Sequence, residues 1–576
     1  MDDYLNLKTV NCKNCYKCIR HCPVKSITFE HGHAEIIPGE CILCGNCFVV
    51  CPQKAKEIRN DVKTAEGLVN SGAEVYASLA PSFAANYINE KTGGGFSLAA
   101  MTGALKKLGF AGVEETAVGA TMVKRRYDEM VNSAVQDVII SSCCHSVNRL
   151  VQKYYPEVLP YLAHVVSPMQ AHCMDIKRRY SGAKTVFIGP CVSKKAEAEY
   201  YAGFTDCVLT FGELSLWLAD HSIMIEETPE ETSDLGLARL FPVPGGILKT
   251  MKKANSDYTY LYVDGVDNCI AALGDIAGGG IKKCFIEMSL CAGSCTGGPV
   301  MNWGGTGRGE RGNRPVRDYI AVSSYAGTRD FETGTYPEEA LGKKFESLRG
   351  RRIQFGENAI VEALRKTGKT KPEHELNCGT CGYTTCRDKA RAVLEGKADL
   401  FMCLPYLVEK AESFSDDIIK NTPNGIIVLN ENLEVQQINA AACKMFGISP
   451  SNIMGEQIIR ILDPAPFFEA VQEGKNAYNR RIYLPDYEKH LERTIIYDKS
   501  YRIIICIMRD ITEETKRTES QEEFNRTTIE LTDRVIEKQM RTVQEIASLL
   551  GETAAETKVA LTKLKESVLR ETKRDE

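Results

Sequence analysis

The sequence predicts a multidomain α/β protein. Its 576 residues exceed the size of a single compact domain, and 43% of them are hydrophobic, which is enough for several cores. The middle of the chain alternates short apolar, strand-like runs with amphipathic stretches that have helical spacing. Cysteines are dense up to Cys403, and only Cys443 and Cys506 follow. This change in composition predicts that a domain of a different kind begins near residue 412.

The overall composition indicates which kinds of partner and which cellular compartment to expect. A net charge of −5 argues against nucleic acid as the main partner. We expect no membrane span, because no apolar run reaches about 18 residues. The start Met1-Asp2-Asp3 does not resemble a signal peptide. With 23 cysteines in closely spaced runs, we expect metal ligation in the reducing cytoplasm of an anaerobe, and disulfides are the alternative.

The N-terminal segment, residues 1–65, carries the motif C-x2-C-x2-C-x3-C-P twice. This is the pattern of bacterial two-cluster ferredoxins, in which the fourth ligand of each cluster comes from the other run. The pattern predicts a ferredoxin-like domain that transfers electrons between its two clusters. Two zinc knuckles are the alternative. One [4Fe-4S] cluster would be held by Cys12, Cys15, Cys18 and Cys51, and the other by Cys41, Cys44, Cys47 and Cys22.

Three further cysteine segments directly follow apolar runs in the middle of the chain. They are Cys143–His145, Gly189–Glu197 and Glu287–Cys295. Functional residues of α/β folds gather at strand ends, so this placement is informative. Together the segments resemble the signatures of iron-only ([FeFe]) hydrogenases over residues 70–355. The resemblance implies a two-lobed α/β domain that binds an H-cluster, which is a [4Fe-4S] cubane joined to a two-iron subcluster with CO, CN and a bridging dithiolate.

The resemblance also implies roles for individual residues. Cys143 would pass protons to the two-iron unit, and a buried spare thiol is the alternative. Lys194 and Ser82 would donate hydrogen bonds to the cyanide ligands, and Glu197 would lie close to the site. Cys295 would bridge the two parts of the H-cluster. The implied cubane ligands are Cys144, Cys191, Cys291 and Cys295, and the implied pocket walls include Ala80, Pro81, Ser167 and Pro168.

The chain departs from the catalytic pattern at several positions. Gly189 and Ser289 stand where catalytic relatives have methionines, and we expect their small side chains to leave space and polarity around the cofactor. The proton exit route, which is acidic in those relatives, aligns with the basic stretch Val123–Tyr127 and with Ala163. These differences resemble a sensory branch of the family and predict slow turnover. His145 would tune the cubane or replace a proton donor, and an ordinary histidine is the alternative. Gly304–Gly309 is interpreted as a surface loop because it lacks a phosphate-loop ending.

A fourth cysteine module follows in residues 356–411. Its spacing C-x2-C-x4-C-x16-C resembles a small iron–sulfur domain of electron-transfer proteins. We expect a third accessory [4Fe-4S] cluster, with zinc as the alternative, and a helix over Arg387–Ala398 that delivers the last ligand. The four ligands are Cys378, Cys381, Cys386 and Cys403.

The C-terminal third divides into two segments. Residues 412–516 run from strands through helices to hairpin-like strands and end in Asp510-Ile511-Thr512, which resembles an α+β PAS domain. Residues 517–576 are polar, with apolar positions such as Ile529 and Val535 at helical spacing. These C-terminal helices would pair with a partner or with another copy in a homodimer. The alternative is that they fold back on the PAS domain.

The sequence thus predicts an [FeFe]-hydrogenase-type oxidoreductase of sensory character. H2 and protons would be its substrates, and a ferredoxin-like electron carrier or a downstream signalling protein would be its partner. Hydrogenase maturation proteins would assemble the H-cluster. Two alternatives stay open, which are an ordinary ferredoxin-linked hydrogenase and a non-catalytic iron–sulfur protein related to hydrogenases.

Overall fold

The computed structural model describes residues 4–30, 32–88, 94–228, 234–301, 315–350, 353–550 and 554–571. The chain forms two compact units, Met1–Leu407 and Val408–Glu576. The expected loop Gly304–Gly309 lies outside the described residues. Among the described helices, none is long and apolar enough to cross a membrane.

The N-terminal cysteine domain consists of two short antiparallel strand pairs, β1 with β4 and β2 with β3. Each cysteine run enters a one-turn helix through a left-handed residue, Tyr16 (φ 53°) before α1 and Gly45 (φ 77°) before α2. The elements are β1 (Leu5–Leu7), α1 (Lys17–Arg20), β2 (Ile27–Glu30), β3 (His33–Ile36), α2 (Asn46–Val49) and β4 (Lys56–Ile58).

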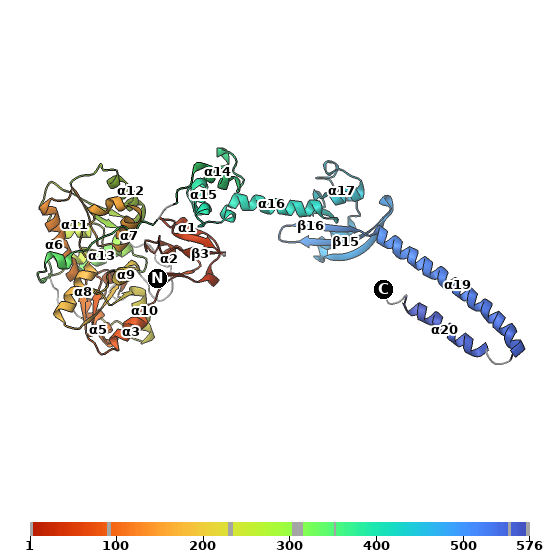
Figure 1. Ribbon diagram of the computed structural model, residues 1–576, viewed down its shortest axis with the longest axis horizontal. Coiled ribbons are helices and arrows are strands. Elements are labelled where there is room, and N and C mark those ends of the chain that lie inside the picture. Colours follow the sequence, from red (N-terminus) through yellow and green to blue (C-terminus); the bar gives the residue numbers. More distant parts are fainter. Residues whose placement is uncertain are drawn as a thin grey trace. The chain divides into compact units, whose positions relative to one another are not determined.

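The middle domain has two lobes, each built on a parallel sheet (Figure 1). The first sheet has the order β6-β5-β8-β9, and the second has the order β10-β11-β7. The strands are β5 (Val75–Leu79), β6 (Gly112–Glu115), β7 (Val138–Ile140), β8 (Lys184–Gly189), β9 (Cys207–Thr210), β10 (Thr259–Asp264) and β11 (Cys284–Ser289).

Buried strands explain the apolar runs seen in the sequence, since the residues of β7 and nearly all of β8 and β11 are buried. Parallel sheets have both faces covered, here by helices. The helices are α3 (Val62–Val69), α4 (Phe83–Asn86), α5 (Leu98–Lys107), α6 (Ala117–Ser133), α7 (His145–Tyr154), α8 (Pro168–Arg179), α9 (Ser193–Tyr200), α10 (Phe211–Asp220), α11 (Gly246–Thr250), α12 (Val266–Ala277) and α13 (Pro315–Tyr325), with 3-10 helices at Pro156–Tyr161, Leu237–Leu240, Ser294–Gly297 and Glu338–Leu341.

The fourth cysteine module is helical and consists of α14 (Glu357–Arg365), α15 (Cys386–Leu394) and a 3-10 helix at Leu400–Met402. The predicted helix over Arg387–Ala398 is therefore too long at its end. Gly396 adopts φ 73°, a left-handed conformation that stops the helix and turns the chain toward Cys403.

The second unit contains a five-stranded antiparallel sheet of order β13-β12-β16-β15-β14. An 18-residue helix, α16 (Leu404–Asn421), precedes the sheet and is absent from the sequence prediction. The other elements are β12 (Gly425–Asn430), β13 (Val435–Ile438), α17 (Ala440–Phe446), α18 (Ala465–Glu473), β14 (Ala477–Leu484), β15 (Lys489–Asp498) and β16 (Ile503–Asp510).

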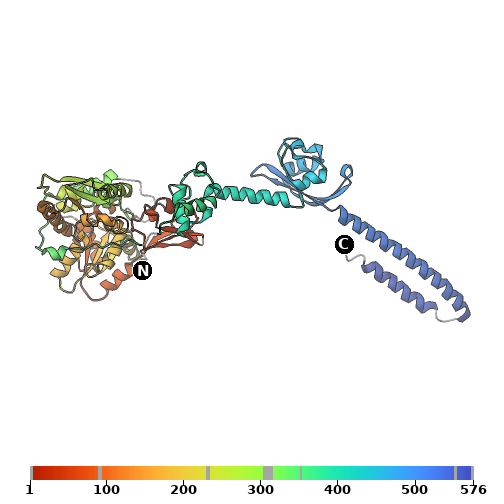
Figure 2. The same cartoon turned by 45° about the horizontal axis from the view of Figure 1, so that its top comes forward.

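Two C-terminal helices form a hairpin, α19 (Thr512–Leu550) and α20 (Ala554–Glu571), as Figures 1 and 2 show from two directions. Lys565 of α20 pairs with Asp533 of α19 at 2.8 Å. The two helices thus cover one another in part. The predicted pairing with a partner or with another copy stays a prediction. Leu531 and Val535 stay 56% and 57% exposed, so apolar surface remains on α19.

Candidate active site and cluster sites

The carboxyl ends of four parallel strands converge on one cavity in the middle domain. Strand β5 leads into Ala80, β7 into Cys143, β8 into Cys191 and β11 into Cys291. The cavity has a volume of about 120 Å³. Its lining includes Ala80, Pro81, Ser82, Cys143, Cys144, His145, Pro168, Phe187, Cys191, Lys194, Met288, Ser289, Cys291 and Cys295.

The four predicted cubane ligands lie together on this lining. Burial, with a further contribution from the nearby Cys144, raises the pKa of Cys191 to about 11. Burial likewise raises the pKa of Cys291 well above its usual value, with added contributions from Cys191, Cys144 and Cys295. Free thiols here stay protonated at neutral pH. Cluster binding must therefore release protons.

Cys143 contacts a buried tyrosine that the sequence analysis named only as part of a basic stretch. The Tyr127 hydroxyl lies 3.1 Å from the Cys143 sulfur and accepts the Ser142 backbone N–H at 3.0 Å. Burial raises the pKa of Cys143 to about 12, although Tyr127 and Lys194 oppose the shift. Burial and Cys143 raise the pKa of Tyr127 well above 10. A phenol of this kind carries protons poorly near neutral pH.

Glu197 lies at the centre of a buried ion cluster behind the cavity. Its side chain is fully buried and accepts hydrogen bonds from Lys194 at 2.5 Å and from Lys343 at 2.6 Å. Burial alone would raise the pKa of Glu197, but the two ammonium groups outweigh it and hold the pKa well below its usual value. Lys343 comes from a segment 146 residues away, and no motif in the sequence pointed to it.

Lys194 reaches from this ion cluster to the cavity wall. Besides Glu197, its ammonium donates to the Cys143 carbonyl at 3.0 Å. A lysine ammonium has three donors, so one remains for a ligand in the cavity.

Two other cavity residues carry buried polar atoms without a partner among the described residues. They are the Ser82 hydroxyl and both ring nitrogens of His145. Burial holds the pKa of His145 well below its usual value, so the imidazole is neutral and has one N–H to donate. Buried polar groups are normally paired, which makes these atoms candidates for contact with a bound group.

The departures from the catalytic pattern have different structural consequences. A Cβ at Gly189 would lie 2.7 Å from the Phe187 ring and 3.2 Å from Ala80, so the expected space beside Gly189 is filled by Phe187. That expectation is wrong at this position, because a neighbouring aromatic ring replaces the missing side chain. Ser289 does bring polarity to the cavity wall, and its hydroxyl pairs with that of Ser294 at 2.9 Å.

Three of the residues aligned with the proton exit route are buried in an apolar core or paired with groups other than Cys143. Val123 and Ala163 are fully buried in an apolar core. Lys124 pairs with Asp330 at 2.6 Å and with the Thr250 carbonyl at 2.7 Å. The expected basic relay therefore does not reach Cys143 through Lys124.

The predicted pocket walls Ser167 and Pro168 begin helix α8. Ser167 caps this helix, and its hydroxyl donates to Glu197 at 3.1 Å, so it supports the ion cluster instead of lining the cavity. Pro168 does line the cavity.

The remaining predicted ligands belong to the N-terminal domain and to the fourth module. Cys22 lines one small cavity together with Cys41, Cys44 and Cys47 of the other cysteine run. This grouping matches one half of the crossed ligand pattern of two-cluster ferredoxins. A further cavity is lined by the four cysteines of the fourth module, Cys378, Cys381, Cys386 and Cys403. Within the described residues, no three His, Cys, Asp or Glu side chains converge on a single metal ion.

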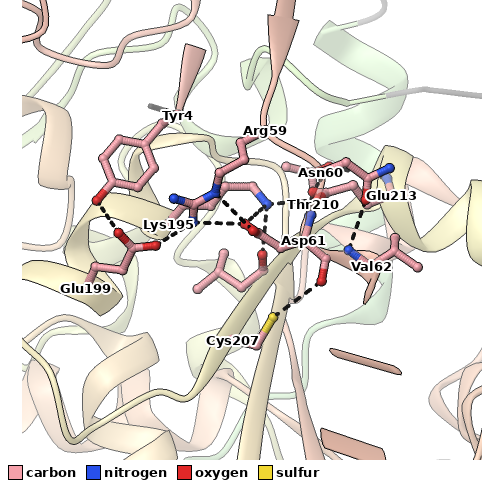
Figure 3. A network of polar contacts seen from close by, with 11 residues as sticks. Tyr4, Arg59, Asn60, Asp61, Val62, Lys195, Glu199, Cys207, Thr210 and Glu213 are labelled. Atoms are coloured by element: carbon pink, nitrogen blue, oxygen red, sulfur yellow. Dashed lines mark hydrogen bonds and ion pairs between the residues drawn. The ribbon is translucent and has the colours of Figure 1, made fainter. Parts of the chain in front are cut away.

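A polar network joins the N-terminal domain to helix α9, which carries Lys194 (Figure 3). Fully buried Lys195 pairs with Asp61 at 2.7 Å and with Glu213 at 2.8 Å. On the same helix, Glu199 accepts from Tyr4 at 2.6 Å. The network holds helix α9, and with it Lys194, against the N-terminal domain, which is expected to transfer electrons.

Comparison with known families agrees with this geometry. The family model for the iron only hydrogenase large subunit, C-terminal domain, matches residues 73–299. The chain contains an iron-only hydrogenase domain. Models of a 4Fe-4S dicluster domain, an Fe-S cluster domain and a PAS fold match residues 4–69, 375–405 and 414–511. The predicted family and the multidomain α/β architecture are thus confirmed.

Individual relatives are similar over different parts of the chain. The periplasmic [Fe] hydrogenase large subunit of Nitratidesulfovibrio vulgaris is 26% identical over 52% of this chain and 87% of its own length. Iron hydrogenase 1 of Clostridium pasteurianum is 28% identical over 32% of this chain and 37% of its own length. A solved [FeFe]-hydrogenase of Chlamydomonas reinhardtii is 16% identical, with a TM-score of 0.39, over 51% of this chain and all of the other.

The residues of the hydrogenase domain fit an H-cluster. Cys144, Cys191, Cys291 and Cys295 surround the cavity as cubane ligands would. The unpartnered Ser82 hydroxyl and the free donor of Lys194 supply hydrogen bonds suited to anionic cyanide ligands. The neutral His145 ring supplies another donor beside Cys144.

Proposed function

We propose that this protein binds H2 and cleaves it heterolytically at low turnover, and that it acts as a hydrogen or redox sensor through its PAS domain and C-terminal helices. The observation that carries the proposal is the single cavity in which four cysteines, a proton-holding thiol and unpartnered donors converge. When bound, the two-iron unit would supply the Lewis-acidic site for H2.

The side chains around the cavity have separable roles in this proposal. Cys143 would hold the proton released when H2 is split, and Lys194 and Ser82 would orient the bound group through hydrogen bonds. Glu197 would keep Lys194 charged and in place, because its carboxylate is fully buried beside the ammonium.

Slow turnover is supported by the surroundings of Cys143. Its sulfur is hydrogen-bonded to a phenol whose pKa lies well above 10, and the aligned residues Val123 and Ala163 are buried and apolar. Each proton that leaves through Tyr127 would meet a high barrier. A sensor tolerates this, since it needs a change of state and not a flux.

Electron transfer is supported by the proximity of the cysteine groups. Cys44, from one ferredoxin group, lines the same cavity as Cys291 of the hydrogenase domain. Cys381 of the fourth module packs against the hydrophobic cluster that contains Cys22. The two electrons from H2 would pass along this line of clusters to a ferredoxin-like carrier or to a signalling partner.

An ordinary ferredoxin-linked hydrogenase is the second candidate. Its specific support is that Cys143, Lys194 and Glu197 are all retained and brought together. In that case the PAS domain would regulate the enzyme or dock it.

One experiment separates the candidates. The protein would be produced with hydrogenase maturation proteins, and infrared spectra and H2 turnover would be recorded on the same sample. We expect carbonyl and cyanide bands together with turnover far below that of ordinary hydrogenases. Absence of the bands would overturn both hydrogenase proposals, and rapid turnover would overturn the sensor proposal.

A further inference from the structure

The fourth cysteine module buries two lysines beside its cysteines. Lys369 is 9% exposed and Lys389 is 5% exposed, and both line the cavity that the four cysteines share. The Lys369 ammonium donates to the Cys403 sulfur at 3.2 Å and to the carbonyl and hydroxyl of Thr367 at 3.2 Å each. Lys389 donates to the Leu400 carbonyl at 3.1 Å.

The Lys369 ammonium differs in kind from the backbone donors to cysteines in the N-terminal domain. The N–H groups of Leu43, Ala55 and Ser26 donate to Cys41, Cys51 and Cys22 at 3.3, 3.2 and 3.3 Å. The buried Lys56 of that domain donates to the Ala34 carbonyl instead. A charged donor makes a stronger hydrogen bond than a neutral amide.

A buried cation next to a cluster changes the free energy of cluster reduction. Reduction adds an electron to an anionic group, and a nearby positive charge stabilises the reduced form in a low-dielectric site. Hydrogen bonds to the sulfur ligands act in the same direction. Lys369 and Lys389 therefore raise the reduction potential of whatever cluster Cys403 ligates.

The module occupies a junction in the first unit. It packs on the N-terminal domain, where the Lys25 ammonium donates to the Gly382 carbonyl at 2.8 Å and Tyr383 shares a core with Cys22. On its other side, Cys403 directly precedes helix α16, and its carbonyl accepts the Leu407 N–H at 2.9 Å in the first turn. A ligand of this cluster is thus also the start of the helix that leads to the PAS domain.

We propose that Lys369 and Lys389 make the fourth-module cluster the most easily reduced of the three accessory clusters, so that it collects an electron at the start of α16. The step is a one-electron transfer in which the neighbouring Cys22-ligated cluster is oxidised and this cluster is reduced. The proposal goes beyond H2 sensing, because it holds for any source of electrons.

The test is a potentiometric titration of the full-length protein with its accessory clusters, followed by electron paramagnetic resonance without H2. The variant Cys378→Ser assigns the signal of the fourth-module cluster. We expect that signal to develop at the highest potential of the three. In Lys369→Met, the ratio of reduced to oxidised cluster at the original midpoint should fall about tenfold, since a hydrogen bond to a charged group contributes about 1.5 kcal/mol or more.

The controls keep the result interpretable. Lys366→Met removes a nearby lysine whose side chain is 61% exposed and should leave all three midpoints unchanged. Lys369→Arg retains a charged donor and should restore most of the shift. Should Lys369→Met fail to retain the cluster, Lys389→Met replaces it, because Lys389 donates to a carbonyl and not to a ligand. A cluster that reduces last in the unmodified protein, or midpoints unmoved by these lysine variants, would overturn the proposal.

Discussion

We predict that the buried ion cluster around Glu197 contributes strongly to the free energy of unfolding. Replacing Glu197 with Gln removes the charge that two ammonium groups share, Lys194 at 2.5 Å and Lys343 at 2.6 Å. The side chains of Glu197 and Lys343 are 0% and 2% exposed, so water cannot compensate. Leaving buried charges unpaired costs about 3–5 kcal/mol of unfolding free energy. Lys343→Met leaves Glu197 with one ammonium partner, Lys194, besides the Ser167 hydroxyl, and we expect a loss of about 1.5–3 kcal/mol.

The assay is denaturant unfolding of the metal-free chain under reducing conditions, followed by tryptophan fluorescence. One of the two tryptophans, Trp217, is buried in the core of the first lobe. The double variant Glu197→Gln/Lys343→Met should lose less than the sum of the single losses, with a coupling of about 1–3 kcal/mol. Lys344→Met is the matched control, because Lys344 is the exposed neighbour of Lys343. Additive losses, or a Lys343→Met effect no larger than that of the control, would refute the reasoning.

The remaining predictions concern pH, packing and the relay thiol. The pKa of Glu197 is lower in the folded state than its unfolded value of about 4.3, so the carboxylate stabilises the fold above that pH and this stabilisation is lost as the pH falls further. The difference in unfolding free energy between wild type and Glu197→Gln should therefore shrink below about pH 4. Burial raises the pKa of Glu287 to about 7, so the unfolding free energy decreases as the pH rises from about 4.3 to 7 and this carboxyl ionises. Glu287→Gln should therefore stabilise the chain more at pH 8 than at pH 4. Equal effects at both pH values would contradict this. Gly189→Met should lower the unfolding free energy by about 1–3 kcal/mol through its clash with Phe187, and Phe187→Leu should recover part of the loss. Cys143→Ala should abolish most H2 turnover of the matured protein while its infrared bands persist, and unchanged turnover would remove the relay role.

Much of the cluster chemistry was accessible from the sequence because thiolate ligands of a cubane come in short local runs. The crossed pairing of Cys22 with the second run follows from a known local pattern, and in the structure Cys22 lines one cavity with Cys41, Cys44 and Cys47. The strands that end at Cys143 and Cys191 were visible as short apolar runs, since buried parallel strands have little polar alternation.

What the sequence did not predict depends on long-range packing. Lys343 meets Glu197 across 146 residues, and a single lysine in a polar segment gives no signal of burial. The volume beside Gly189 could not be judged without the position of Phe187. Tyr127 lies on helix α6, 16 residues before Cys143 in the sequence. Only the fold shows that the Tyr127 hydroxyl, and not a carboxylate, contacts the sulfur.

Helix α16 was missed for a different reason. The loss of cysteines after Cys403 predicts a domain boundary near residue 412, which falls inside this helix. The helix begins with Leu404-Pro405. Proline is tolerated in the first turn of a helix, where its missing N–H is not needed.

The central claim, that the cavity holds an H-cluster oriented by this chain's own donors, is tested most directly by the infrared spectrum of the matured protein beside that of Ser82→Ala. Carbonyl and cyanide bands in both samples, with a cyanide band displaced in Ser82→Ala because its hydrogen bond is lost, are the predicted result. A matured sample without such bands, or cyanide bands identical in the two proteins, would contradict the account.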